Sequence, residues 1–369
     1  MAPSLVAVDP ADSANLERFV DLPRRVYADD PRWIEPMRES VAADLVGKSA
    51  FRAYAGLQAF VAMDGDEVVG RCAALLNPRL LAADGTPLGQ VGHFESIDDR
   101  QAARALFAAA FDWLRARGAR FASGPMNGGA HRAHRLLVEG FEQEPFLLEP
   151  RNPPYYPRLF ADSGFQRLHT WRSFDWQLPQ IERLLDAISG GEERVRKRGD
   201  YRVEAMDGAD RGAVLGRLHT LLDAAWSGHL GYAALDSAEL VEGFAGLLAV
   251  MSPRSLGVLV DAHSGADAGL AYYYPDYAAE VRALRGEASG WGRWLASGVR
   301  PKRAVYHTIA LRPEVRSIGA AQFLLAEMVR NSLADGHDRC VVALVDEGFR
   351  IFERVSPPSR RYELYGRPL

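Results

Sequence analysis

The stretch ALRPEVRSIGAAQFLLAEM, residues 310–328, changes character halfway along its length. It begins as the end of an apolar, strand-like run, passes a proline turn and Arg316, and becomes an apolar helix pattern from Gly319 onward. The first turn of a helix has N–H groups without internal partners, and the helix dipole adds partial positive charge there. The stretch therefore predicts either a plain helix start or a helix N-terminus that binds phosphate groups.

The order of elements around this stretch occurs twice in the chain. The first half has a hairpin at 57–77, a strand at 89–98, a helix at 98–118 and a closing strand at 165–176. The second half has a hairpin at 256–277, a strand at 304–311, a helix at 319–336 and a closing strand at 360–366. A helix that connects two strands of one sheet usually makes them parallel neighbours. The repeated order predicts a mixed α/β fold with two similar domains.

The boundary between these domains is expected near LPQIERLLDAISGGEERVRKRGD, residues 178–200. Its Gly-Gly pair and mixed charges are typical of a helix and linker and not of a core element. The sequence thus predicts a first domain at 1–178, a linker at 179–198 and a second domain at 199–369.

The motif at 310–321 resembles the acyl-CoA-binding signature of the GNAT N-acetyltransferase superfamily, in which R-x-x-G-x-G/A opens a helix after a strand and a proline turn. Further segments together resemble a bacterial group of tandem GNAT-like proteins: FVDLPRRVYADDPRWIEP (19–36), GHFESIDD (92–99), GPMN (124–127), NPPYYPRLFADSGF (152–165) and RRYELYGRP (360–368). The resemblance implies an α/β fold with an α+β mixed sheet, organised as two tandem GNAT-like acyl-CoA N-acyltransferase domains. It also implies acetyl-CoA or another acyl-CoA as cofactor.

Within the second domain, the resemblance assigns cofactor binding to Ile309, Leu311, Arg316, Ser317, Ile318, Gly319, Ala320 and Ala321. In GNAT enzymes a backbone N–H on the preceding strand polarises the thioester carbonyl, which here falls around Ile309 to Leu311. Gly319 would let the backbone approach a pyrophosphate, and the small residues after it keep side chains away.

The first half lacks this motif. At the equivalent helix start it has Asp98 and Asp99, either of which can cap the helix. Two carboxylates there would repel a pyrophosphate. We therefore expect the domain at 1–178 to lack CoA binding.

Two residues are candidates for moving the proton of an amine acceptor. His307 lies on the strand that leads to the motif, where an imidazole can titrate near neutral pH. Asp276 ends the tyrosine-rich hairpin strand. Each also has a structural interpretation, as a hydrogen-bonded core histidine and as a turn aspartate after Pro275. The tyrosine that many GNAT enzymes use as acid is replaced by Phe352.

Composition and local sequence patterns argue against several other classes of protein. The net charge of -4 and the lack of a dense basic tract argue against nucleic acid, and no apolar run is long enough to predict a membrane span. The N-terminus shows no signal-peptide pattern, and Cys72 and Cys340 sit in apolar runs as expected for buried thiols, so a cytoplasmic protein is expected. His131 and His134 are three residues apart without a ligand partner, which favours a loop or helix surface over a metal site.

The sequence leaves three functions open. The first is an N-acyltransferase, acetyl-CoA-dependent, that acts on a small-molecule or peptide amine. The second is a non-catalytic CoA- or ligand-binding regulatory protein with the GNAT fold. The third is an aminoacyl transferase of the peptide-bridge type. A homodimer is left open in each case.

Overall fold

The computed structural model describes residues 3–206, 211–290, 298–316 and 319–369. The strands of the first half are β1 (Ser4–Ala7), β2 (Gly56–Asp64), β3 (Glu67–Leu81), β4 (Pro87–Ser96), β5 (Phe121–Gly124), β6 (Leu136–Glu139) and β7 (Gln166–Gln177). Its helices are α1 (Ser13–Val26), α2 (Arg38–Leu45), the 3-10 helix η1 (Ala50–Ala53), α3 (Arg100–Arg115) and α4 (Tyr156–Asp162).

The second half repeats most of this order. Its strands are β8 (Tyr201–Ala205), β9 (Leu256–Asp261), β10 (Asp267–Pro275), β11 (Arg303–Leu311), β12 (Arg339–Asp346) and β13 (Arg360–Pro368). Its α-helices are α5 (Leu178–Arg198), α6 (Arg211–Trp226), α7 (Ser237–Leu248), α8 (Ala278–Ala283) and α10 (Ala320–Ala334). The described residues of this half also form three short 3-10 helices: η2 (Ala288–Gly290), η3 (Pro313–Val315) and η4 (Ile351–Arg354).

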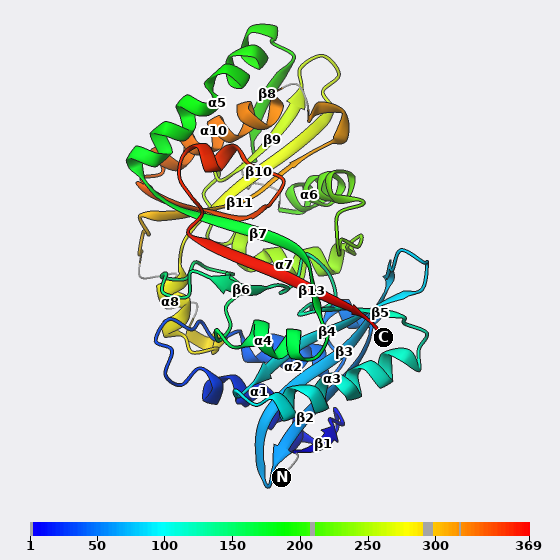
Figure 1. Cartoon of the computed structure of the whole chain (residues 1–369). Coiled ribbons are helices and arrows are strands. Elements are labelled where there is room, and N and C mark those ends of the chain that lie inside the picture. Colours follow the sequence, from blue (N-terminus) through cyan, green and yellow to red (C-terminus); the bar gives the residue numbers. More distant parts are fainter. Residues whose placement is uncertain (1–2, 207–210, 291–297, 317–318) are drawn as a thin grey trace.

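The two halves share one sheet because they exchange their closing strands. The strand order in the described residues is β1-β2-β3-β4-β5-β13-β7-β12-β11-β10-β9-β8, with β6 paired to β13. Strand β13, from the end of the second half, therefore pairs with β5 of the first half, and β7 pairs with β12 of the second. Figure 1 shows β7 and β13 crossing the middle of the molecule side by side. The predicted parallel pairs, β4 with β5 and β11 with β12, are both present.

Helices cover both faces of each half-sheet. In the first half, Phe60 and Ala62 of β2 face the core under α3, and the alternating Ala59 and Val61 face α1. In the second half, β10 sends Tyr273 into the core with α5 and α10, while Tyr272 packs with α6 and α7. This alternation is the period-2 pattern of a strand buried on both faces.

The expectation that the segment 179–198 is a linker outside any core is wrong. The segment belongs to α5, a 21-residue helix, and Ile181, Leu184 and Ile188 lie fully buried in the core with α10. The apolar spacing of three and four residues makes one face of the helix hydrophobic despite its charges. The positions of the domain limits at 178 and 199 stay a prediction, because the exchanged strands distribute both halves over one sheet.

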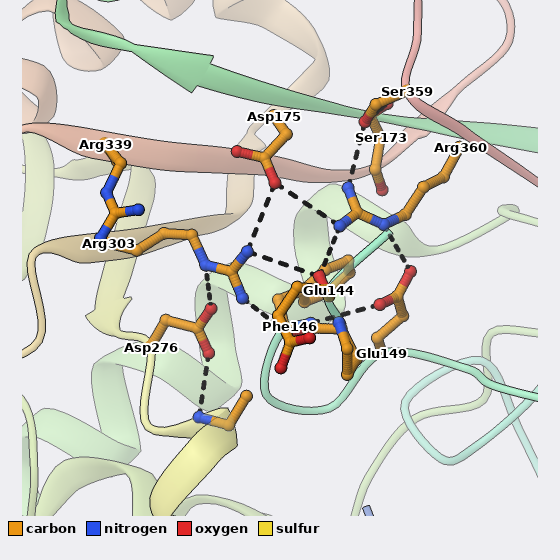
Figure 2. A network of polar contacts seen from close by, with 12 residues as sticks. Glu144, Phe146, Glu149, Ser173, Asp175, Asp276, Arg303, Arg339, Ser359 and Arg360 are labelled. Atoms are coloured by element: carbon orange, nitrogen blue, oxygen red, sulfur yellow. Dashed lines mark hydrogen bonds and ion pairs between the residues drawn. The ribbon is translucent and has the colours of Figure 1, made fainter. Parts of the chain in front are cut away.

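A buried polar network fastens a loop of the first half to the exchanged strands (Figure 2). Arg360 of β13, 1% exposed, pairs with Glu149 at 3.0 Å and donates to the carbonyl of Glu144 at 2.7 Å. Arg303 of β11 donates to the carbonyl of Pro145 at 2.5 Å, and both arginines contact Asp175 of β7. Two guanidinium groups thus hold the loop at 144–149 against β7, β11 and β13.

Candidate functional site

The parallel pair of the second half separates at His307. The described pairing of β11 with β12 runs from Arg303 to Tyr306, and β11 then continues to Leu311 along β10 alone. The register against β10 shifts at the same place, from Tyr272↔Thr308 to Tyr273↔Tyr306, so His307 is the extra residue of a β-bulge. A bulge next to a strand separation redirects a side chain, and such bulges often lie beside active sites.

The first half has an equivalent bulge, and it also carries a histidine. Strand β4 pairs with β5 only from Leu88 to Gln90 in the described residues, and its register against β3 shifts between Arg71 and Ala73. His93 lies in this bulge with φ 48, in the left-handed region. Each half therefore has a histidine in the bulge of the strand before its crossover helix: His307 directly follows the last parallel pair, and His93 lies three residues beyond it.

His307 is held in an aromatic environment with a depressed proton affinity. Its ring stacks on Tyr272 at 5.8 Å between centroids, and Nδ1 lies 3.0 Å from the hydroxyl of Thr308. Burial, and then the positive charge of Arg135, lower the pKa of His307 to about 4. The imidazole is therefore neutral at physiological pH and has a lone pair to accept a proton.

Asp276, the second candidate base, is occupied by structural contacts. Its Oδ1 accepts from the backbone N–H of Leu147 at 2.9 Å and of Ala278 at 3.1 Å, and its Oδ2 pairs with Arg303 at 2.5 Å. Figure 2 shows this carboxylate inside the network that joins the halves. These contacts favour the structural interpretation of Asp276, as a turn aspartate that also binds Arg303.

His93 anchors the junction loop, residues 125–135, which follows β5 and reaches the second half. Its Nε2 lies 3.4 Å from Oδ2 of Asp44 on α2, and both side chains are buried. Asp44 also accepts from Ser49 at 2.6 Å and pairs with Arg132 of the loop. Burial alone would raise the pKa of Asp44, but hydrogen bonds and charge from His93 and Arg132 outweigh it and lower that pKa. The His93 N–H donates to Asn127 at 2.8 Å, a second tie to the same loop.

The expectation that His131 and His134 lie on a surface is wrong. Both belong to the junction loop, residues 125–135, which is packed between the halves. His134 is 6% exposed and packs edge-on against Trp171 of β7. His131 is half-buried, with Nε2 3.6 Å from Glu239 of α7. The loop also donates from the Ala130 N–H to the carbonyl of Gly231 in the second half, at 2.8 Å. The two histidines thus face the contact between the halves.

The predicted phosphate-binding residues are tied to neighbouring backbone. Arg316 donates to the carbonyl of Ala225, at the end of α6, at 2.6 Å and to that of Leu311 at 3.2 Å. Gly319 precedes α10 with φ 88 and lies against Gly191 of α5. Ala320 is fully buried, Leu311 is in the core beneath α10, and Ile309 and Ala321 pack against the same core. Ser317 and Ile318 lie outside the described residues.

Gly319 therefore has a structural role that needs no ligand. A Cβ at this position would lie 2.9 Å from the carbonyl oxygen of Gly191, on a backbone with φ 88. We expect Gly319→Ala to lower the free energy of unfolding by about 1–3 kcal/mol, measured by chemical denaturation.

Gly243→Ala on α7 is the matched control, because a Cβ there would meet no atom within 4 Å. It should raise stability by about 0.5–1 kcal/mol through helix propensity. Equal stability of Gly319→Ala and the parent would contradict the close packing of α5 on α10.

The first half lacks the equivalent open helix start, as expected. Asp99 is the N-cap of α3, and its carboxylate accepts from the N–H groups of Gln101 at 2.7 Å and Ala102 at 3.4 Å. The side chain of Asp98 pairs with Arg158. Whether 1–178 binds CoA stays a prediction, with carboxylates at the place that a pyrophosphate would need.

His93, Asp44, Arg132 and Arg135 were missed by the sequence analysis. A histidine on the strand before each crossover helix is the signal that could have found His93, because aligning the two halves puts His93 and His307 on corresponding strands. No periodic pattern marks Asp44 or the arginines, which come together only through the long junction loop.

The fold defines the class: a tandem GNAT-like protein. A tandem GNAT protein from the clavulanic acid biosynthesis pathway superposes over 99% of this chain and 98% of its own, with a TM-score of 0.55 at 14% identity.

None of the helices in the described part of the chain has the length and apolar composition of a membrane span.

Two proteins of similar sequence identify the family to which the chain belongs. Protein YghO of Escherichia coli K12 is 26% identical over 371 residues, covering 95% of this chain and 92% of that protein. The bacterial ceramide synthase of Caulobacter vibrioides (strain NA1000 / CB15N) is 30% identical over 291 residues, covering 76% of this chain and 73% of that protein. The chain belongs to the same family as this ceramide synthase and has the tandem GNAT fold. No protein-family model matches the chain.

Proposed function

We propose that this protein is an N-acyltransferase that moves a fatty acyl group from an acyl-CoA thioester to the amine of a long-chain amino alcohol. A ceramide is the amide of those two components, and a relative at 30% identity is named a bacterial ceramide synthase. The observation that carries the chemistry is His307, a neutral imidazole at a bulge where β11 leaves β12.

In this proposal the amine nitrogen attacks the thioester carbonyl carbon. The new C–N bond forms, the C–S bond breaks, and the thiolate takes up the one proton that the amine loses, relayed by His307, so that CoA leaves as the thiol. His307 accepts the proton that the amine loses, and backbone near Ile309 to Leu311 receives the carbonyl oxygen. Arg316 and the start of α10 hold the CoA phosphates once the Arg316 contacts to Ala225 and Leu311 rearrange.

An apolar face of α7, separated from His307 by Tyr272, supports a hydrocarbon acceptor. Phe244 of α7 packs edge-on against Tyr272 at 5.6 Å, and Tyr272 stacks on His307. On the same helix Val241 is 46% exposed, and Leu247 and Leu248 are half-buried. A long alkyl chain lying along α7 would gain about 0.8 kcal/mol for each CH₂ that it buries.

Binding of the donor is tested by thermal unfolding with CoA, acetyl-CoA and decanoyl-CoA. A ligand that binds only the folded state adds about 2.7 kcal/mol at one hundred times its dissociation constant, which corresponds to a rise of roughly 5–10 °C. We expect decanoyl-CoA to give the same rise at a lower concentration than acetyl-CoA, because the longer chain buries more apolar surface.

A mixture of CoA and free decanoate is the control for non-specific effects of the fatty chain. Equal shifts with acetyl-CoA and decanoyl-CoA would contradict a fatty acyl donor. No shift with any CoA species would favour the binding-protein interpretation with a different ligand.

A further inference from the structure

The C-terminal part of α7 and the turn that follows it are apolar but lie at the surface. Residues 243–251, GFAGLLAVM, contain no charged or polar side chain. Each of these described residues is exposed or half-buried, and none is fully buried. A helix segment that is apolar on all sides is typical of a protein core or of a membrane. The exposure of this one therefore indicates a contact outside the chain.

The exposed side of α7 is a stripe of three apolar residues. Val241, Ala245 and Ala249 are four residues apart, so they follow one another along the same side of the helix. All three are exposed, and Val241 is 46% exposed. The half-buried Leu248 borders the stripe toward the core. The stripe thus presents a continuous apolar strip to the surroundings.

The two charged residues of α7 fix the helix in this orientation. Glu242, beside the stripe, accepts from the backbone N–H of Ala50 in η1 at 2.8 Å. Glu239 accepts from the hydroxyl of Tyr54 at 2.8 Å. Both carboxylates therefore bind the first half, and they hold α7 so that the stripe stays on the outside.

The size of the stripe favours a lipid bilayer over a second copy of the chain. A helix of 12 residues is about 18 Å long and about 10 Å wide, so one side of it offers roughly 200 Å². A stable protein dimer buries about 800 Å² on each partner. A single apolar helix face can still insert between lipid headgroups, where no complementary surface is required.

We propose that α7 docks this protein on the surface of a lipid bilayer, with Val241, Ala245 and Ala249 inserted between the headgroups. The helix lies on the membrane and does not span it. This inference rests on the proposed function, because the acceptor and the amide product of that reaction are lipids that a bilayer holds. Phe244 of the same helix packs against Tyr272, so the docked helix also contacts the aromatic group that stacks on His307.

Binding to vesicles of phosphatidylcholine tests the proposal. The full chain is mixed with the vesicles and sedimented, and the bound fraction gives an apparent dissociation constant. We expect the parent to bind, and to stay bound at high salt, because the stripe is uncharged and screening does not weaken its insertion. Val241→Glu combined with Ala245→Glu should weaken binding by at least about tenfold, because two carboxylates would have to enter the headgroup boundary.

Gln101→Glu combined with Ala108→Glu is the matched control. Both positions are exposed on α3, and the double change adds the same charge as the α7 variant. The control should bind vesicles as the parent does. No binding by the parent, loss of its binding at high salt, or equal binding by the parent and the α7 variant would overturn the proposal.

Thermal unfolding checks that the α7 variant is folded. The substituted side chains are exposed, so we expect its midpoint within a few degrees of the parent's. If the midpoint is lower, Ala249→Glu replaces the double variant, since Ala249 lies at the end of the helix and is exposed. Equal vesicle binding by the parent and Ala249→Glu would then overturn the proposal.

Sedimentation equilibrium without vesicles tests the alternative occupant. A parent dimer that the α7 variant converts to a monomer would identify a second copy of the chain as the partner and would overturn the proposal. The vesicle experiment needs no substrate, so it is independent of catalysis. Vesicle binding without amide formation would refute the proposed function alone, and amide formation without vesicle binding would refute the docking surface alone.

Discussion

His307→Gln is expected to lower the turnover of amide formation by about 100- to 10,000-fold, the range for loss of a positioned general base. Glutamine keeps a polar side chain of similar length that can contact Thr308 and Tyr272, but it cannot accept the amine proton. Because the glutamine amide can replace the polar contacts of Nδ1 with Tyr272 and Thr308, the substitution should cost no more than about 1 kcal/mol of stability. Steady-state kinetics with decanoyl-CoA and a long-chain amino alcohol measure the effect.

His93→Gln is the matched control, since His93 occupies the corresponding bulge of the first half. Its contacts with Asp44 and the junction loop predict mainly a loss of stability, with turnover within about tenfold of the parent. The reverse result, in which His93→Gln abolishes turnover and His307→Gln does not, would move the catalytic base to the first half.

The pKa of His307 also fixes the acid side of the pH dependence. The base is functional in its neutral form, so protonation of His307 should lower kcat only as the pH approaches about 4, whereas kcat/KM also falls below the pKa of the amine as its neutral fraction decreases. Stability follows the same group: the unfolded chain binds a proton near 6.5 and the folded chain only near 4. Between those values the unfolded state binds more protons, so stability falls as the pH is lowered through that window.

Arg360→Met is expected to be the most destabilising single substitution that we predict, with a loss of about 3–5 kcal/mol in the free energy of unfolding. It removes the cation between Glu149 and Asp175 and leaves the 2%-exposed carboxylate of Glu149 without its ion pair. Chemical denaturation monitored by tryptophan fluorescence measures it, since Trp176 and Trp171 lie on the neighbouring strand β7.

Arg339→Met is the control for Arg360→Met. Arg339 lies close to the same network in Figure 2, but its side chain is 49% exposed. Its ion pair with Asp338 is long, at 3.8 Å. A surface pair of this kind contributes little, so the change should stay within about 0.5 kcal/mol. Similar effects of the two substitutions would contradict the assignment of Arg360 as the buried tie between the halves.

The sequence was sufficient to predict the elements that have a local signal. The hairpin at 57–77, the crossover helices at 98–118 and 319–336 and the closing strands appear in the structure with shifts of a few residues. Turn residues between the hairpin strands, an N-cap at Asp99 and apolar spacing in the helices define these elements within a short window. The resemblance at 310–321 led to the GNAT fold for the same reason.

The exchange of β7 and β13 has no local signal. A closing strand with apolar residues on both faces suits the sheet of either half, and only the packing of the whole chain decides between them. The same exchange brings Trp171 of β7 next to the junction loop, where His134 and Arg135 pack against it. The sequence therefore indicated His307 from its own strand but carried no signal for the contacts of the junction loop.

Incubating the purified chain with decanoyl-CoA and a long-chain amino alcohol, and measuring both products, shows directly whether it forms the amide. Mass spectrometry quantifies the amide, and a thiol reagent quantifies released CoA. We expect one thiol for each amide formed, with both products lost in His307→Gln. Thiol release without amide, or amide formation that is unchanged in His307→Gln, would contradict it.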